Sequence, residues 1–184
     1  MKFTPQEIPD IILVEPNLHA DDRGYFLETF RQDLFNAAVG SIVNFVQDNE
    51  SKSSKGVLRG LHYQVSPYSQ SKLVKVIEGS VLDVSVDIRR SSPTFGHHVA
   101  IELSSDNKKQ LFIPKGFAHG FVVLSDSATF TYKVDSLYAP EYERGIAFDD
   151  KDLKINWQLS SDILKLSNKD QNSPRLSNAK DLFD

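Results

Sequence analysis

One segment of the chain, residues 80–88, constrains the fold more than any other. It reads SVLDVSVDI, with an apolar side chain at every second position. Successive side chains of a β-strand point to opposite faces, so this alternation predicts a strand with one apolar and one polar face. The apolar face holds Leu82, Val84, Val86 and Ile88, and the polar face holds Asp83, Ser85 and Asp87. Such a strand is expected to be half buried.

The same alternation recurs along the chain, and turn-forming residues separate the alternating segments. It is repeated at residues 99–103 and again at residues 128–134. Gly79, Ser91–Pro93 and Ser104–Asn107 punctuate these segments with residue types that favour turns. This spacing predicts a mainly β fold, built as an antiparallel sandwich or barrel.

The N-terminal part of the sequence predicts further strands. Residues 11–15 are an apolar run that Pro16 closes, which is typical of a buried strand near a sheet edge. Residues 25–30 alternate well enough to form a strand after a turn, and residues 42–49 predict another. Residues 51–55, which read SKSSK, are expected to be a polar loop.

Only short helices are expected. Residues 31–38 have apolar side chains at helical spacing, and Gly40 is suited to end that helix. After Trp157 the sequence becomes polar, with brief helices predicted near residues 163–166 and 179–183. We expect this tail to pack on the barrel, so that residues 1–184 form a single domain.

Composition limits the functions that such a domain can have. The chain has 184 residues, 40% of them hydrophobic, with 21 Lys+Arg against 25 Asp+Glu and a formal charge of -4. It has no basic run, so we expect no nucleic-acid partner. The absence of cysteine excludes thiolate catalysis and zinc–thiolate sites, and is compatible with a reducing compartment. No apolar leader or membrane-spanning run is present, so we expect a cytoplasmic protein without membrane contact.

The segment Lys55–Gln64 is the first candidate for function. Arg59 and His62 lie there within an apolar and aromatic run that predicts a strand. A folded core rarely accepts either side chain without a partner, so the segment indicates binding or proton transfer. The alternative is that His62 is a core histidine bonded to a carbonyl.

The spacing of these two residues makes a structural prediction. Because Arg59 and His62 are three apart, a regular strand would point them to opposite faces. A β-bulge or kink at Gly60 would bring both into one site, and glycine tolerates such a distortion.

A second candidate histidine follows a turn. The segment Ile113–Phe121 reads IPKGFAHGF, in which Pro114 and Gly116 form the turn and His119 opens the next strand, expected at residues 121–124. The arrangement resembles jelly-roll barrels of the cupin kind, where such a turn aims a histidine into the barrel mouth.

A metal site is not expected, although many cupins bind a metal through a His-x-His pair. This chain has His62-Tyr63-Gln64 at that place, and two distant imidazoles are too few ligands. The adjacent His97 and His98 point to opposite faces of a strand. We therefore expect no metal and no other cofactor.

Acid/base chemistry needs neither metal nor thiol. A pocket that holds His62, Lys72, His119, Tyr132 and Asp170 would supply a base, a carboxylate to orient it and a lysine for an oxyanion. A phenol on the far side would return the proton. The alternatives are that Lys72 and Asp170 are solvated surface charges and that Tyr132 is a core aromatic.

Six motifs together closely resemble the dTDP-4-dehydrorhamnose 3,5-epimerase family. They appear in the family's order and read DDRGYFLE from Asp21, QDN from Gln47, GVLRGLHYQ from Gly56, PKGFAH from Pro114, YAPEYE from Tyr138 and LSNKD from Leu166. Together they span the chain from Asp21 to Asp170.

The resemblance implies a role for each matching residue. His62 is the base, Asp170 its partner, Lys72 the group that stabilises the enolate oxygen and Tyr132 the acid on the far face. The implied substrate-binding residues are Arg23, Phe26, Glu28, Gln47, Asp48, Asn49, Arg59, Lys72, His119, Tyr138, Glu143 and Lys169. Arg23 and Arg59 suit the diphosphate, because a guanidinium pairs with phosphate oxygens.

The resemblance also implies a reaction and an assembly. The substrate is dTDP-4-keto-6-deoxy-D-glucose, and inversion at both carbons beside the keto group gives dTDP-4-keto-L-rhamnose, for dTDP-L-rhamnose and thus lipopolysaccharide or cell-wall polysaccharide. The family forms homodimers by strand exchange, in which the region Arg23–Glu28 is expected to reach the partner's site. A mono-epimerase, an epimerase of a related nucleotide sugar, a non-catalytic sugar-binding cupin and a metal-dependent oxygenase are the alternatives.

Overall fold

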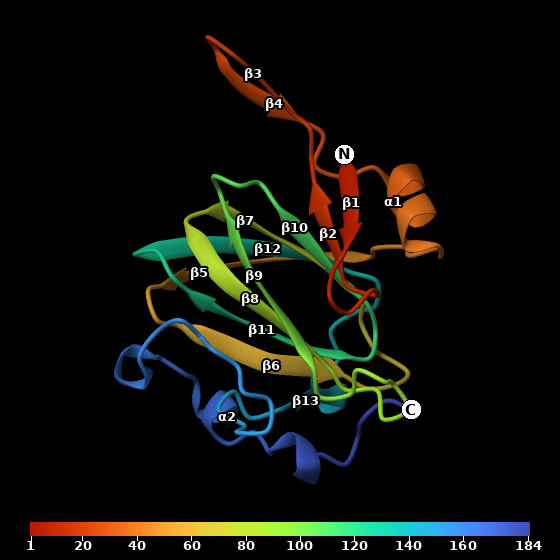
Figure 1. The fold of residues 1–184 in the computed structure, drawn as a ribbon, viewed down its shortest axis with the longest axis vertical. Coiled ribbons are helices and arrows are strands. Elements are labelled where there is room, and N and C mark those ends of the chain that lie inside the picture. The colour runs from red at the N-terminus through yellow and green to blue at the C-terminus, as the bar shows by residue number, and fades with distance from the viewer.

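Two antiparallel sheets face each other in the computed structural model, which describes residues 1–184 (Figure 1). The first sheet has six strands in the order β1 (Lys2–Pro5), β2 (Ile12–Glu15), β10 (Gln110–Ile113), β7 (Lys72–Glu78), β12 (Ser127–Val134) and β5 (Gln47–Ser54). The second has five, in the order β13 (Glu143–Gly145), β6 (Leu58–Gln64), β11 (Phe117–Val123), β8 (Ser80–Asp87) and β9 (His98–Ser104). The expected mainly β, jelly-roll architecture is confirmed.

A separate hairpin projects from one end of this body (Figure 1). It consists of β3 (Leu18–Asp21) and β4 (Gly24–Leu27), which pair only with each other. The strand predicted at residues 25–30 is therefore shorter than expected and ends at Leu27. Most of the hairpin is exposed, so contacts with the rest of the chain do little to stabilise its conformation.

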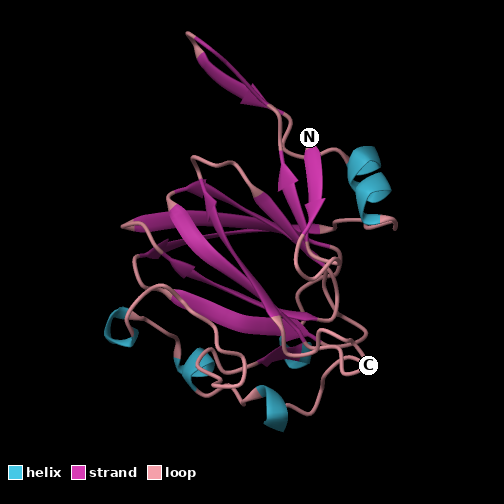
Figure 2. Ribbon diagram, viewed as in Figure 1, coloured by secondary structure: helices cyan, strands magenta, loops and turns pink.

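The helices are few and short (Figure 2). The predicted N-terminal helix is α1 (Gln32–Val39), and Gly40 ends it in the left-handed region at φ 69°. The other helical segments are α2 (Asn168–Gln171) and the 3₁₀ turns Pro140–Tyr142, Ser161–Ile163 and Leu176–Asn178. No helix forms at residues 179–183, where one was expected. None of the helices is long and apolar enough to span a membrane.

Three apolar clusters hold the sheets in place. The largest fills the space between the sheets and includes Val74, Val81 and Phe130. A second lies between the outer face of the five-stranded sheet and the C-terminal tail, where Trp157 packs. The third joins Phe35 of α1 to the six-stranded sheet. The tail thus packs on the barrel, as expected.

Strand β8 is buried on both faces, which corrects the expectation of a half-buried strand. Its apolar face is covered by the C-terminal tail. Its polar face points into the barrel, where Asp83, Ser85 and Asp87 are each 0% exposed. The alternation correctly divided the faces, but it could not reveal that polar side chains fill part of the interior.

Strand β5 lies where the sequence predicted a loop. The strand is Gln47–Ser54, and residues 42–46 have no regular structure, so both the strand predicted at 42–49 and the loop at 51–55 are wrong in their bounds. β5 is an edge strand that pairs with β12 over eight residues, and most of its side chains alternate between partly buried and exposed. Polar side chains are compatible with such an edge.

The predicted irregularity at Gly60 is present. His62 of β6 pairs with His119 of β11, whereas Arg59 pairs with Phe121, so the register shifts by one residue between them. Gly60 has φ 129°, and a Cβ there would lie 2.5 Å from the Gly120 Cα. Only glycine fits this close approach, which lets Arg59 and His62 face the same cavity.

Candidate active site

A cavity of about 550 Å³ opens between the edges of the two sheets and the segment 165–170. Strands β5, β6, β7, β11 and β12 all contribute to its walls. The polar residues that line it are Asn49, Glu50, Ser51, Arg59, His62, Lys72, His119, Tyr132, Lys165, Ser167, Lys169 and Asp170. All five residues predicted for acid/base chemistry therefore lie around one cavity.

His62 and Asp170 form the shortest polar contact of the group. His62 Nε2 lies 2.5 Å from Asp170 Oδ1, and Asp170 is 4% exposed. The Ser167 hydroxyl donates to Asp170 Oδ2 at 2.8 Å and accepts from the Asp170 backbone N–H, so the first turn of α2 fixes the carboxylate. Burial favours a higher pKa for Asp170, but hydrogen bonds and the charge of His62 outweigh it and lower the pKa. A carboxylate in this state orients an imidazole and stabilises its cation.

Lys72 lies at the start of β7, and the cavity wall partly buries it. Burial lowers its pKa to about 8, and the negative charges of Glu143 and Asp83 work against this decrease. Its Nζ is 6.0 Å from the centre of the Tyr132 ring. A protonated lysine at this position can stabilise an oxyanion in the cavity that Tyr132 and the two histidines also line.

Tyr132 stands on the interior face of β12 with Phe130, as the alternation predicted. Burial raises the pKa of its phenol, and the charge of Glu143 raises it further. The group is therefore protonated near neutral pH and available as a proton donor.

Cationic side chains gather at the mouth of the cavity. Arg59 is held by Ser53, whose hydroxyl accepts from Nε at 3.2 Å and from Nη2 at 3.1 Å. Lys165 and Lys169 line the same opening. Neither Lys165 nor Ser53 was predicted from the sequence, and no motif marks them.

A hydrogen-bonded chain of the predicted substrate residues borders the cavity. Tyr138 donates through its backbone N–H to Gln47 and through its hydroxyl to Glu143, at 3.1 and 2.7 Å. Gln47 in turn donates to Asn49 at 2.8 Å, and Lys169 pairs with Glu143 at 2.5 Å. Burial raises the pKa of Glu143, but the hydrogen bonds from Lys169 and Tyr138 outweigh burial, so the pKa is lowered.

Four of the predicted substrate residues lie away from the cavity. Arg23 and Phe26 are in the projecting hairpin (Figure 1), and Glu28 follows it. The side chain of Phe26 is 73% exposed. Asp48 points to the outer face of its sheet, where its carboxylate pairs with Lys133 at 3.0 Å. Within one chain, the structure does not bring these residues to the acid/base group.

No three His, Asp or Glu side chains are arranged to share a metal ion. Gln64, which stands where a metal-binding cupin has its second histidine, is 4% exposed. Its amide donates to the carbonyls of Tyr68 and Leu137 and accepts from the Ala139 N–H. The side chain thus fixes a loop at this position.

A buried pair beside the predicted site was missed. His119 Nε2 lies 2.8 Å from Asp83 Oδ2, and Asp83 is completely buried. The two residues are 36 positions apart in the sequence, so no local pattern links them.

Comparisons with known proteins identify the family. The family model of dTDP-4-dehydrorhamnose 3,5-epimerase matches residues 5–178. A protein of that name from Shigella flexneri is 53% identical over 179 residues, covering 97% of this chain and 98% of that one. The crystal structure of the Elizabethkingia anophelis enzyme superimposes with a TM-score of 0.94 and 47% identity, covering 97% of each chain. That of a Legionella pneumophila 3,5-epimerase in complex with dTDP-4-keto-L-rhamnose gives 0.93 and 46%, covering 97% and 94%. The chain therefore belongs to the dTDP-4-dehydrorhamnose 3,5-epimerase family.

Proposed function

We propose that this chain catalyses the cofactor-independent 3,5-epimerisation of dTDP-4-keto-6-deoxy-D-glucose to dTDP-4-keto-L-rhamnose. The observation that carries the proposal is the His62–Asp170 pair at 2.5 Å, in a cavity that also holds Lys72 and Tyr132. The family model and the ligand named in the Legionella structure support the same substrate class. We further propose that residues 1–184 act as one domain in the cytoplasm.

The first step is removal of a proton from a carbon next to the 4-keto group. His62 accepts this proton, and Asp170 holds the imidazole in place and stabilises the cation that forms. The electron pair moves onto the keto oxygen as an enolate. Lys72 stabilises that oxygen, and its positive charge at neutral pH is consistent with a pKa of about 8.

The second step returns a proton to the opposite face of the same carbon. Tyr132 stands on β12, whereas His62 stands on β6 of the other sheet, so the two groups approach the cavity from different walls. The phenol donates its proton, which inverts the carbon, and solvent exchange restores both side chains. Repetition at the second carbon completes the reaction.

The nucleotide end of the substrate fits the mouth of the cavity. Arg59, already oriented by Ser53, and Lys169 supply the positive charges that a diphosphate needs. Gln47 and Asn49 offer amide groups on the adjoining edge strand.

Part of each site is proposed to come from a second copy of the chain. The β3–β4 hairpin extends away from its own body (Figure 1), and the side chains of Phe26 and Arg23 on it are exposed. In a homodimer with exchanged strands, these side chains would reach the partner's cavity, where Arg23 would meet the diphosphate.

Incubation with the dTDP-keto sugar in deuterated water tests the proposed reaction. Deuterium is expected at both carbons beside the keto group, in a product with the L configuration. Deuterium and inversion at only one carbon would identify a mono-epimerase instead. Binding without any exchange would identify a sugar-binding protein and contradict the proposal.

Exhaustive chelation is expected to leave the activity unchanged. The proposed chemistry uses only an imidazole, a phenol and an ammonium group. In addition, the side chain of Gln64 hydrogen-bonds to backbone groups and is not free to bind a metal. The measurement is turnover after dialysis against EDTA, together with metal analysis of the pure protein. Loss of turnover that one added metal restores would overturn this prediction.

A mixing experiment tests the shared site. Arg23→Ala and His62→Ala are each expected to be nearly inactive alone. When the two variants are refolded together, about a quarter of the wild-type activity should return, because half of the dimers are mixed and each has one intact site. No recovery, with sedimentation as a monomer, would show that the hairpin serves its own chain.

A further inference from the structure

Asp83 is a buried carboxylate that the reaction described above does not use. It lies on the interior face of β8 and is completely shielded from solvent. Its only hydrogen-bond partner is His119, at 2.8 Å from Oδ2. Its other oxygen, Oδ1, has no partner, nor does the hydroxyl of Ser85 on the same face. A half-satisfied buried carboxylate destabilises a fold, so its presence calls for a reason other than stability.

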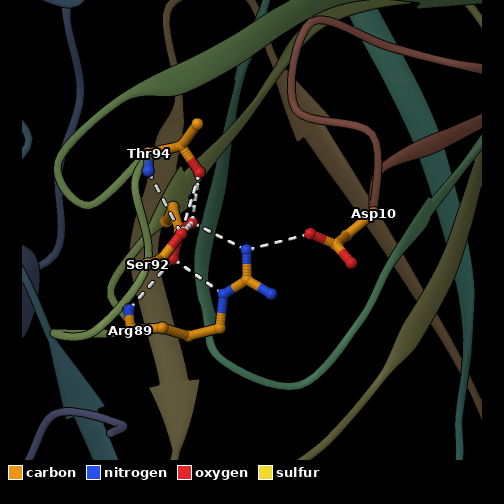
Figure 3. A network of polar contacts seen from close by, with 5 residues as sticks. Asp10, Arg89, Ser92 and Thr94 are labelled. Carbon is orange, nitrogen blue, oxygen red and sulfur yellow. Dashed lines mark hydrogen bonds and ion pairs between the residues drawn. The ribbon is translucent and has the colours of Figure 1, made fainter.

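A second aspartate on the same strand shows what a purely structural carboxylate looks like here. Asp87 shares the interior face of β8 and is equally buried. Arg89, Ser92 and Thr94 all donate to its two oxygens, and Arg89 also reaches Asp10 (Figure 3). Asp87 is therefore fully paired and contacts no residue of the cavity lining, whereas the only partner of Asp83, His119, is a lining residue.

The contact between Asp83 and His119 determines which ring nitrogen remains free. A carboxylate accepts a hydrogen bond, so Nε2 of His119 is the donor in this pair. The other nitrogen, Nδ1, makes no hydrogen bond within the chain and is not among the buried unpaired atoms, while the residue lines the cavity. Burial lowers the pKa of His119. Asp83 raises it, whereas the positive charges of Lys72 and His62 lower it further. The ring is thus neutral, with Nδ1 as an acceptor open to the ligand.

Asp83 also contributes to the charge around Lys72. The negative charges of Glu143 on β13 and Asp83 on β8 both favour the charged form of Lys72. Asp83 is hydrogen-bonded to His119, which lines the same cavity as Lys72, Tyr132 and His62. Glu143 already pairs with Lys169 and Tyr138. Asp83, by contrast, has no lysine or arginine partner, and its one contact is with His119.

We propose that Asp83 is a positioning residue, which fixes His119 as an acceptor for a sugar hydroxyl and supplies a buried negative charge next to the cavity that holds Lys72. The proposal rests on the proposed function. It adds that His119 meets a hydroxyl of the substrate and not the keto oxygen, since only a donor can bond to the free nitrogen. Lys72 then remains the group for the enolate.

Nitrogen NMR of the histidine-labelled free protein tests the first half without any substrate. The signals of His119, assigned by their loss in His119→Gln, are expected to show a proton on Nε2 and a bare Nδ1 between pH 6 and 8. In Asp83→Asn this preference should weaken. A proton on Nδ1 in the wild type would overturn the proposal, even if the variant does not fold.

The pH profile of turnover tests the second half. Lys72 must be protonated, so activity falls as the pH rises through its pKa of about 8. Removing the negative charge of Asp83 lowers that pKa further, so in Asp83→Asn the alkaline limb of the pH profile should move to lower pH. The kcat should fall roughly tenfold to a hundredfold with little change in KM.

Asp87→Asn is the matched control, because it removes an equally buried carboxylate from the same face of β8. It should reduce the melting temperature and leave the alkaline limb in place. Equal displacement of the limb in both variants, or none in Asp83→Asn, would contradict the role of Asp83. A wild-type protein that shows no epimerisation would refute the proposed function, while the NMR result would still decide the state of His119.

Discussion

Replacement of His62 by alanine is expected to reduce deuterium exchange and epimerisation together, by at least about a hundredfold, the usual contribution of a positioned general base. Both processes begin with the same proton abstraction, so neither can proceed without the imidazole. The measurement is deuterium incorporation by NMR beside product formation, at saturating substrate. Binding of the nucleotide should change little, because Arg59 and Lys169 at the cavity mouth remain.

His97→Ala is the control for this variant, because His97 is exposed and lies outside the cavity lining. It should retain wild-type exchange. Asp170→Asn should resemble His62→Ala in kind, since it keeps the shape but removes the charge that stabilises the imidazolium. Near-normal exchange in His62→Ala would assign the base to another residue.

Tyr132→Phe is expected to separate exchange from inversion. The substitution keeps the ring and its contact with Phe130 but deletes the proton donor. His62 would still remove a proton and return solvent deuterium to the same face, so exchange persists. Inversion should fall by roughly a hundredfold, and to different extents at the two carbons. The measurement compares deuterium content with configuration at each carbon.

Tyr63→Phe provides the matched control, because Tyr63 is a buried tyrosine of β6 that packs against Phe183 and does not line the cavity. It should leave exchange and inversion coupled. Equal loss of both processes in Tyr132→Phe, with normal substrate binding, would exclude Tyr132 as a separate acid.

The sequence predicted which side chains meet in the cavity better than it predicted the strands that frame the cavity. His62, Lys72, His119, Tyr132 and Asp170 were named from their chemistry and from motifs, and all five line one cavity. The distortion at Gly60 could be predicted because Arg59 and His62 are three residues apart, and a regular strand would point them to opposite faces. That prediction needs only the spacing of two residues and does not depend on what packs against the strand.

The failures have a common physical origin in long-range pairing. β5 reads QDNESKSS and has no apolar period, because its regular conformation comes from hydrogen bonds to β12. Asp83 is a diagonal neighbour of His119 only because Ser85 lies opposite His119 in the β8–β11 register. Arg23, Phe26 and Glu28 lie away from the cavity of their own chain, and a single sequence cannot specify which copy they serve.

The contact between His62 and Asp170 has a consequence for synthesis of the protein. The two residues are 108 positions apart, with the base in the barrel and its partner on the tail that covers the five-stranded sheet. All strands of the two sheets end by Gly145, so during translation they are made before residues 165–170. A nascent chain of that length contains the base but not its carboxylate. We therefore expect the pair of His62 and Asp170 to form only when the tail docks on the five-stranded sheet.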